Sequence, residues 1–80
     1  MNFDVLVKLV GYGKYIIETH LIELFKKCDS CSKDEIECDI YTMRHLDLIG
    51  KHTYYGYKIN HDNIKKFLNS TGNYSFPVVS

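Results

Sequence analysis

The residues best suited to chemistry are three cysteines and a histidine in the middle of the sequence. Cys28 and Cys31 are separated by two residues, and Cys38 and His45 each follow after six more. Zinc accepts thiolate and imidazole ligands, but this spacing matches none of the common zinc-finger patterns. Alternation also places Cys38 on the apolar side of a strand, where a buried thiol behaves as a small hydrophobic group. We therefore expect no metal site and no cofactor.

The other motifs that would support catalysis are incomplete. Gly11-Tyr12-Gly13-Lys14 lacks the spacing of a phosphate-binding loop, and a turn accounts for both glycines. The four histidines are scattered without an i, i+4 pair. No paired carboxylates or nucleophile triad can be assembled around them. The sequence therefore predicts that the protein is not an enzyme.

Tyrosines are the most informative side chains. Within residues 54–58, alternation along a strand sends Tyr55 and Tyr57 to one face and Tyr54 and Lys58 to the other. Aromatic side chains around a glycine stack on bases in RNA-recognition motifs, although stacking usually comes with a basic groove. If one tyrosine face packs on a helix instead, the others are exposed, and exposed tyrosines recur as anchors of protein interfaces. The candidate partner-binding residues are Tyr12, Tyr41, Tyr54, Tyr57, Lys58, Lys65 and Lys66.

The N-terminal part of the chain is expected to form a β-hairpin. Residues 3–10 alternate as a strand does, and their apolar face is made by Phe3, Val5, Val7 and Leu9. A Gly-Tyr-Gly loop, with Gly13 in the left-handed conformation, then returns the chain antiparallel. Residues 15–28 also fit a helix, but no capping residue precedes them and their first turn is rich in β-formers. We favour the hairpin, after which Leu21–Cys28 can turn helical.

A loop and two further strands are expected in the middle of the chain. Residues 26–35 are polar, which is typical of a loop. Residues 36–45 alternate between apolar and polar side chains, as in a half-exposed strand. Gly50 marks a turn, and residues 52–59 form the next strand.

The best-specified element is a helix over about residues 60–71. Asn60 is a favourable N-cap, and Ile59 and Ile64 occupy the two positions of a hydrophobic staple. Gly72 fits the position just past the end of a helix. Ile64, Phe67 and Leu68 form the apolar stripe of this helix, and Lys65 and Lys66 face water on the opposite side.

These elements make a single α+β domain over residues 1–80. We expect a small antiparallel sheet with an N-terminal hairpin and the C-terminal helix packed on one face. A closing strand over residues 74–79 contains Pro77, which confines that strand to a sheet edge. If residues 15–28 are helical, the order becomes the ferredoxin-like βαββαβ arrangement.

Length and charge limit the classes of function. Eighty residues allow one domain. No apolar run is long enough to span a membrane, and the first residues lack a secretory signal, so we expect a cytoplasmic protein with reduced cysteines. Ten basic and ten acidic side chains give a net charge of zero. A partner gripped mainly by non-specific electrostatics, such as bulk DNA or an anionic membrane, is therefore not expected.

Charge is distributed unevenly along the chain, and the choice of residue types is biased. Residues 1–27 carry a net charge of +1, residues 28–50 of −4 and residues 51–80 of +3. Such a dipolar surface favours oriented docking to a protein, although the same charges also blunt an exposed strand edge. Residue types with AT-rich codons are abundant and alanine is absent. This bias is common in the small genes of phages, viruses and mobile elements.

Three functions follow, in order of preference. The first is a small non-catalytic protein-binding module, encoded by a phage, virus or mobile element, that inhibits or modulates a host defence or housekeeping complex. The second is a single-stranded nucleic-acid binder that uses residues 54–58 with Lys65 and Lys66. The third is a zinc-stabilised domain that uses the Cys28, Cys31, Cys38 and His45 side chains. An exposed strand edge also allows a homo-oligomer.

Overall fold

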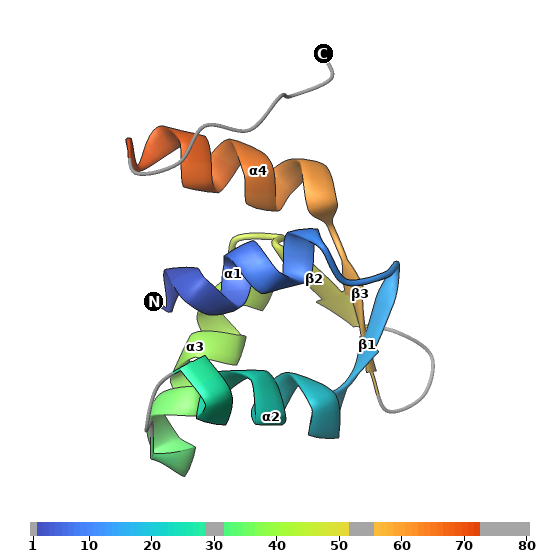
Figure 1. The fold of residues 1–80 in the computed structure, drawn as a ribbon, viewed down its shortest axis with the longest axis vertical. Helices are drawn as coiled ribbons and strands as arrows, with labels where there is room; N and C mark the ends of the chain where they lie inside the picture. Colours follow the sequence, from blue (N-terminus) through green and yellow to red (C-terminus); the bar gives the residue numbers. More distant parts are fainter. Residues whose placement is uncertain (1, 29–31, 52–55, 73–80) are drawn as a thin grey trace.

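The computed structural model describes residues 2–28, 32–51 and 56–72, which form four helices and a three-stranded antiparallel sheet (Figure 1). In chain order the elements are α1 (Phe3–Val10), β1 (Tyr15–Ile17), α2 (Glu18–Cys28), α3 (Lys33–His45), β2 (Ile49–Lys51), β3 (Gly56–Ile59) and α4 (His61–Ser70). β3 lies between β1 and β2 and pairs with both. The predicted α+β class is confirmed. The ferredoxin-like order is wrong, because the first element is a helix and two helices follow one another directly.

Residues 3–10 form a helix where we predicted the first strand of a hairpin. Asn2 caps this helix, because its side-chain oxygen accepts hydrogen bonds from the backbone N–H groups of Asp4 and Val5. Val5, Leu6 and Leu9 are all fully buried, and their spacing of one, three and four residues places them on one side of a helix. The apolar residues on both supposed strand faces are therefore the wide buried stripe of a helix.

Residues 15–28 combine the two alternatives left open by the sequence. Tyr15–Ile17 is a strand, but it pairs with β3 and not with residues 3–9, so the predicted hairpin register is wrong. The helical start of α2 at Glu18 confirms the expectation for Leu21–Cys28. Gly13 does not adopt the left-handed conformation that we expected of it, because it joins a helix to a strand and closes no hairpin.

α3 replaces the predicted strand over residues 36–45 and the end of the predicted loop. Ser32 begins the helix as one half of a capping box: its hydroxyl accepts a hydrogen bond from the Glu35 N–H and donates one to the Glu35 carboxylate. The buried residues recur at helical spacing and are Ile36, Ile40 and Met43. Cys38, which a strand would have turned towards the core, is exposed.

The hairpin between β2 and β3 was predicted only in part. Gly50 lies within β2 and not in a turn, so that prediction is wrong. The strand expected over residues 52–59 is present from Gly56 onwards, and residues 52–55 lie outside the described part of the chain. Tyr57 and Lys58 are adjacent in β3 and so project from opposite faces of the sheet, as predicted; Tyr57 is half-buried and Lys58 exposed.

α4 confirms the predicted C-terminal helix to within one residue at each end. Ile59 and Ile64 are both buried, as a hydrophobic staple requires. Gly72 has a φ of 78°, the left-handed conformation that favours glycine just past a helix end. Lys66 is exposed as predicted, whereas Lys65 is half-buried. The strand predicted over residues 74–79 lies outside the described residues.

Side-chain hydrogen bonds fasten the start of α4 to two distant turns. Asn60 occupies the N-cap position but makes no capping bond; its amide donates to the backbone carbonyl of Asp47 at 2.8 Å. The Asn63 amide donates to the same carbonyl at 2.8 Å. The His61 ring nitrogen Nε2 hydrogen bonds to the Gly13 carbonyl at 2.7 Å. The α3–β2 and α1–β1 connections are thus both held by the first turn of α4.

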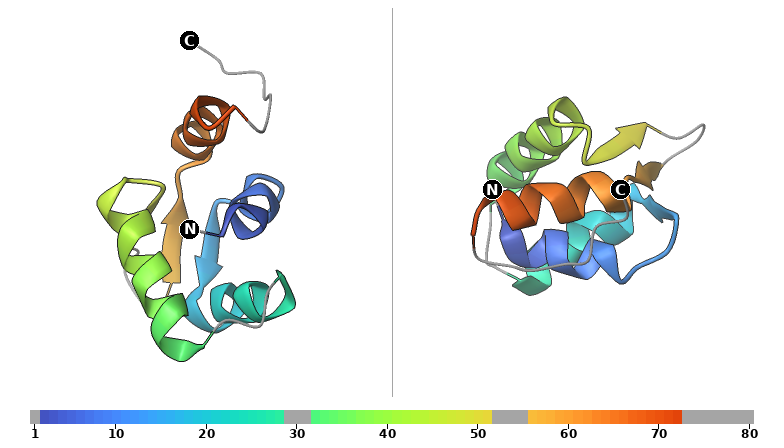
Figure 2. Two further views of the ribbon diagram at one scale, coloured as in Figure 1. Left: turned by 90° about the vertical axis from the view of Figure 1, so that its left-hand side faces the viewer. Right: turned by 90° about the horizontal axis from the view of Figure 1, so that it is seen from above.

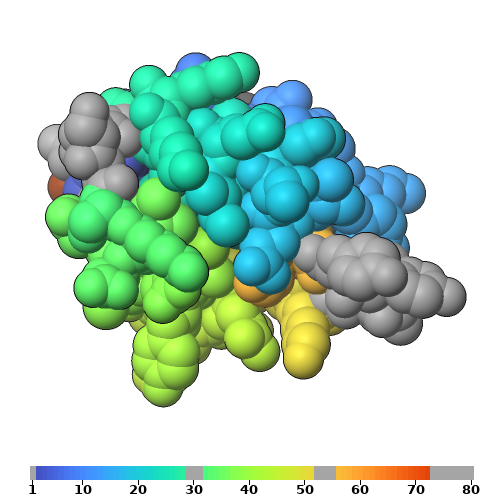
Figure 3. Space-filling model, turned by 90° about the horizontal axis from the view of Figure 1, so that it is seen from below, coloured from blue at the N-terminus to red at the C-terminus, as the bar shows by residue number. Residues whose placement is uncertain are grey.

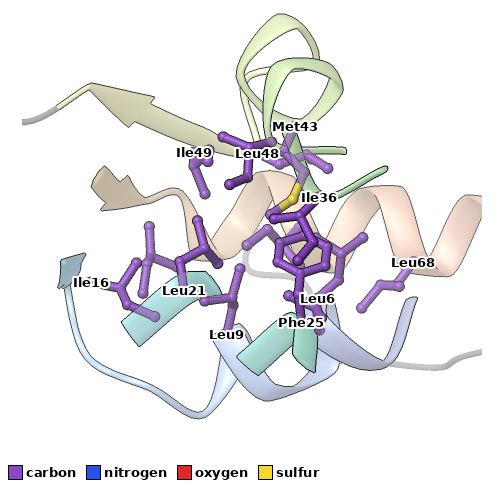
Figure 4. Close-up of a cluster of buried hydrophobic side chains, with 14 residues drawn as sticks. Leu6, Leu9, Ile16, Leu21, Phe25, Ile36, Met43, Leu48, Ile49 and Leu68 are labelled. Carbon is purple, nitrogen blue, oxygen red and sulfur yellow. The ribbon is translucent and has the colours of Figure 1, made fainter. Parts of the chain in front are cut away.

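One hydrophobic core joins the elements. α1 lies between α2 and α4, while α3 covers the sheet beside β2 (Figures 1 and 2). Phe25 is the largest fully buried side chain and lies at the centre, near Leu6 and Ile36 (Figure 4). Within the described ranges, none of the helices combines the length and the apolar character needed to cross a lipid bilayer.

Replacing Gly56 by alanine is expected to destabilise the sheet by about 2 kcal/mol, because a Cβ at this position would lie only 2.6 Å from the carbonyl oxygen of Ile16 in the neighbouring strand. Backbone atoms of a paired strand cannot move aside as a flexible side chain would. Urea unfolding followed by circular dichroism measures the loss. Gly13→Ala is the matched control, since nothing lies within 4 Å of its added Cβ. An equal loss in both variants would contradict the close approach.

Candidate functional site

A groove of about 580 Å³ runs between α2 and α3. Figure 3 shows the face of the molecule that carries both helices, with α2 in teal and α3 in green. The floor of the groove is apolar, since the lining includes the buried Ile36 and Ile40 and the half-buried Ile22. The charged and aromatic residues that complete the lining are Glu18, Lys26, Lys33, Glu37, Tyr41, Arg44 and Tyr57.

Helical spacing explains why these side chains share one groove. On α2 the lining residues recur every four positions, and on α3 every three or four, so each set forms one stripe along its helix. Lys26 lies in the last turn of α2 and Lys33 begins α3. These two lysines therefore lie towards the end of the groove next to the helix connection. Glu18 and Arg44 lie towards the opposite end, where the sheet begins.

Tyr57 closes the sheet end of the groove. Burial raises the pKa of its hydroxyl, and the nearby Glu18 carboxylate raises it further by charge repulsion of the phenolate and by a hydrogen bond, while the Arg44 guanidinium acts in the opposite sense. The hydroxyl is protonated at neutral pH, as that of any ordinary tyrosine is, and it donates a hydrogen bond to Glu18. This hydrogen bond links the central strand to the first turn of α2.

The lining continues beyond Tyr57 into a second hollow of about 610 Å³. Glu18, Arg44 and Tyr57 line both hollows, so the two form one continuous surface. The residues that only the second hollow contributes are Ile17, Thr19, Lys51 and Gly56. Ile17 is 47% exposed although it is aliphatic, which extends the apolar surface to the edge of the sheet.

Tyr41 projects from the edge of the groove. It is 71% exposed, more than any other large hydrophobic side chain among the described residues. Its ring lies nearly parallel to that of His45, one turn further along α3, with the ring centroids 6.4 Å apart. The stacking restrains the ring and lowers the entropy that it would lose on binding a partner.

The structure brings together two of the seven candidate residues predicted from the sequence. Tyr41 and Tyr57 both line the groove. Tyr12 lies elsewhere and its hydroxyl hydrogen bonds to Nδ1 of His20 at 3.2 Å. Lys58 projects from the opposite face of the sheet, Lys65 and Lys66 belong to α4, and Tyr54 lies outside the described residues.

Sequence reasoning missed most of the groove. Ile22 and Lys26 were assigned to a segment of undecided structure, Lys33 to a loop and Arg44 to a strand. The signal that identifies them is the spacing of three and four residues on either side of residues 29–32, which becomes visible once Ser32 is taken as a helix cap.

The cysteines do not form a metal site in the part of the chain that is described. Cys28 is half-buried and Cys38 exposed, and both are free thiols. Across residues 2–28, 32–51 and 56–72, no three His, Cys, Asp or Glu side chains lie close enough together to hold a metal ion. Cys31 lies outside these ranges.

Comparison of the chain with protein-family models, with curated proteins and with solved structures finds no match. The geometry and chemistry of the groove are therefore the basis on which a function is argued.

The Tyr57→Phe variant is expected to lose less stability at alkaline pH than the wild-type protein. A raised pKa in the folded state means that Tyr57 contributes fully to stability below the unfolded-state pKa of about 10, and that this contribution is lost as the pH rises through the folded-state value. Thermal melts between neutral pH and pH values above about 10 measure the effect. Tyr41→Phe, which removes an exposed hydroxyl, is the control. If both variants follow the wild-type profile, Tyr57 is not linked to folding in this way.

Proposed function

We propose that this protein is a small non-catalytic binding module that docks on another protein through the α2–α3 groove. The observation that carries the proposal is the combination, in one groove, of an apolar floor, a highly exposed tyrosine and a rim of charged side chains. Protein interfaces have this composition: Tyr and Arg are enriched in them, and the energy is concentrated where apolar pockets are surrounded by a polar rim.

The order of the elements brings in duplex DNA as a second candidate. α2 and α3 are consecutive helices joined by residues 29–32, and the three-stranded sheet has the order β1-β3-β2. This is the arrangement of a winged helix-turn-helix domain, in which the second of the two helices enters the major groove of DNA. By this analogy α3 would be the helix that contacts DNA.

The charge of α3 favours a protein partner over DNA. Two cations, Lys33 and Arg44, stand against four carboxylates, which are Asp34, Glu35, Glu37 and Asp39. Binding of a protein to phosphates depends on Lys and Arg side chains that release counterions, and a net negative helix opposes it. The helix-turn-helix arrangement is therefore better suited here to a protein surface than to a nucleic acid.

The expectation of single-stranded nucleic-acid binding gains little from the geometry. Tyr57 is half-buried and its hydroxyl is hydrogen-bonded to Glu18, so less of its ring is open to stacking on a base than in a fully exposed tyrosine. Lys58 lies on the other face of the sheet.

The abundance of residue types with AT-rich codons is common in the small genes of phages, viruses and mobile elements. It supports the further proposal that the partner is a host protein and that this protein inhibits or modulates the complex to which that partner belongs.

Affinity capture from host-cell lysate tests the proposed function, with the wild-type chain compared with a Tyr41→Ala, Arg44→Ala double variant. Wild type is expected to retain a stoichiometric protein, and the double variant to lose most of it. Lys66→Ala on α4 is the control and is expected to capture the partner as wild type does. Capture that is independent of Tyr41 and Arg44, or the absence of any stoichiometric partner, contradicts the proposal. Tight duplex binding with a steep dependence on salt would favour the DNA candidate instead.

A further inference from the structure

We infer that the occupant of the α2–α3 groove is an amphipathic α-helix of the partner, with an apolar stripe on the groove floor and acidic side chains beside Lys26 and Lys33. This inference rests on the proposed function and specifies the chemistry of the segment that is bound. It is carried by three features of the groove: its shape, the order of apolar and charged side chains along it, and its excess of positive charge.

The shape of the groove suits a helix. The stripe of α3 forms one side of the groove along that helix, and α2 meets it at a steep angle (Figures 1 and 2). Laying an apolar helical face into a groove is a recurring mode of peptide recognition. α3 has 13 residues and is therefore about 20 Å long. A bound helix of about the same length would present anchors at positions i, i+3 or i+4, and i+7, which matches the spacing of the groove's own side chains.

The apolar side chains lie in the middle of the groove. Ile36 and Ile40 are 3% and 9% exposed, so they form a fixed floor, and Ile22 on the facing helix is half-buried. Tyr41 stands on one edge, where its ring can cover an apolar anchor once a partner is bound. A leucine or isoleucine stripe would bury these surfaces, at about 25 cal/mol for each Å² removed from water.

The charges around the groove favour an acidic occupant. The lining of the groove and of its continuation contains four cations, which are Lys26, Lys33, Arg44 and Lys51. Two carboxylates oppose them, and one of these, Glu18, already accepts the hydrogen bond from Tyr57. The surface is thus net positive in a chain whose total charge is zero, so complementarity requires carboxylates on the partner.

Lys26 and Lys33 give the occupant a direction. Both are exposed, both line the groove, and they mark its end next to residues 29–32. The apolar residues follow towards Tyr57 and the sheet. Carboxylates of the partner are therefore expected at the Lys26 and Lys33 end, with its apolar anchors between that end and the sheet.

Two synthetic peptides of about 14 residues, long enough for about four helical turns, test the inference with the full-length protein. Both carry the same leucine stripe; one has glutamates at one end, and the other has lysines at the same positions. Fluorescence anisotropy measures the affinities, and NMR amide shifts locate the binding site. The glutamate peptide is expected to bind at least about tenfold more tightly than the lysine peptide, a difference of 1.4 kcal/mol, and to shift amides of α2 and α3.

A charge exchange makes the test specific to this groove. In a Lys26→Glu, Lys33→Glu variant the preference is expected to reverse, so that the lysine peptide binds more tightly. Lys66→Glu changes charge by the same kind of substitution on α4 and is expected to leave the preference unchanged. Circular dichroism verifies folding, and if the double Glu variant is misfolded, Lys26→Gln with Lys33→Gln replaces it and is expected to abolish the preference.

Several results would overturn the inference. Equal affinity for the two peptides, amide shifts outside α2 and α3, or a preference that survives the charge exchange each exclude an acidic helix in this groove. Displacement of the peptide by duplex DNA at comparable concentration would assign the groove to nucleic acid. If these peptide experiments fail while a captured partner still depends on Tyr41 and Arg44, the inference is wrong and the proposed protein-binding function stands.

Discussion

Replacing Phe25 by alanine is expected to lower the free energy of unfolding by about 3–5 kcal/mol, the largest loss that we expect from any single side chain here. Phe25 is fully buried and is the largest of the side chains in the core. It points from α2 into the space between α1 and α3, near Leu6 and Ile36 (Figure 4). Truncation removes apolar contacts on several elements at once and leaves a cavity that rigid helices cannot fully close.

For a domain of this size, such a loss corresponds to a fall of more than about 12 °C in the melting temperature. Thermal melts and urea unfolding by circular dichroism measure it. Phe67→Ala is the matched control, since Phe67 is half-buried and stacks on Phe3 with ring centroids 6.1 Å apart. The control is expected to lose less than half as much. Equal losses would show that the α1–α4 contact, and not Phe25, dominates the core.

The position of Phe25 also decides how the groove is supported. α2 is anchored by Phe25 and Leu21 on its buried face, while Glu18, Ile22 and Lys26 on another face line the groove. A helix anchored on one side presents the other side in a fixed orientation. Stability of the core and definition of the proposed binding surface therefore depend on the same helix.

The C-terminal helix was predictable because local and tertiary signals agree there. Asn60 and Gly72 are favourable residues for the two ends, and Ile59 and Ile64 are spaced for a hydrophobic staple. Even so, the Asn60 side chain bonds to the Asp47 carbonyl and not to its own helix. A sequence pattern identified the right position, but the hydrogen-bond partner depends on a turn 13 residues away, which local rules do not contain.

The two misassigned helices show the opposite case. Val5 and Leu9, like Ile36 and Ile40, are four residues apart, a spacing that period 2 describes as well as period 3.6 does over a short stretch, and three of the four are β-branched. The distinguishing residues lie just outside these stretches, at Asn2 and Ser32, whose side chains cap the helices. An assignment made from the alternating apolar pattern alone, without the helix-capping residues, therefore predicts strands where the backbone is helical.

The candidate site was predictable only at its aromatic residues. Tyr41 and Tyr57 were selected because tyrosine is enriched at interfaces, which holds whatever element carries it. The lysines and isoleucines of the groove come together only when α2 and α3 are both helices. Their grouping could not be predicted once residues 36–45 were assigned to a strand, because a strand sends alternate side chains to opposite faces.

Replacing Cys38 by proline is expected to cost about 3 kcal/mol or more, because it tests the helical assignment of α3 directly. Cys38 is exposed and lies in the interior of the helix, so the substitution removes little packing. It does remove a backbone N–H from the helix ladder and places the proline ring against the preceding turn. The Thr42 hydroxyl, which donates to the Cys38 carbonyl at 2.9 Å, belongs to the same turn.

Cys38→Ala separates the backbone effect from loss of the thiol. Alanine favours helices over cysteine by up to about 0.7 kcal/mol, so this control is expected to be neutral or slightly stabilising. Because Cys38 does not line the groove, the alanine variant is also expected to bind the glutamate peptide as wild type does, whereas the proline variant is expected to lose binding. A proline variant that melts with the wild-type protein would contradict a continuous α3, and with it the wall on which both the groove and its proposed occupant depend.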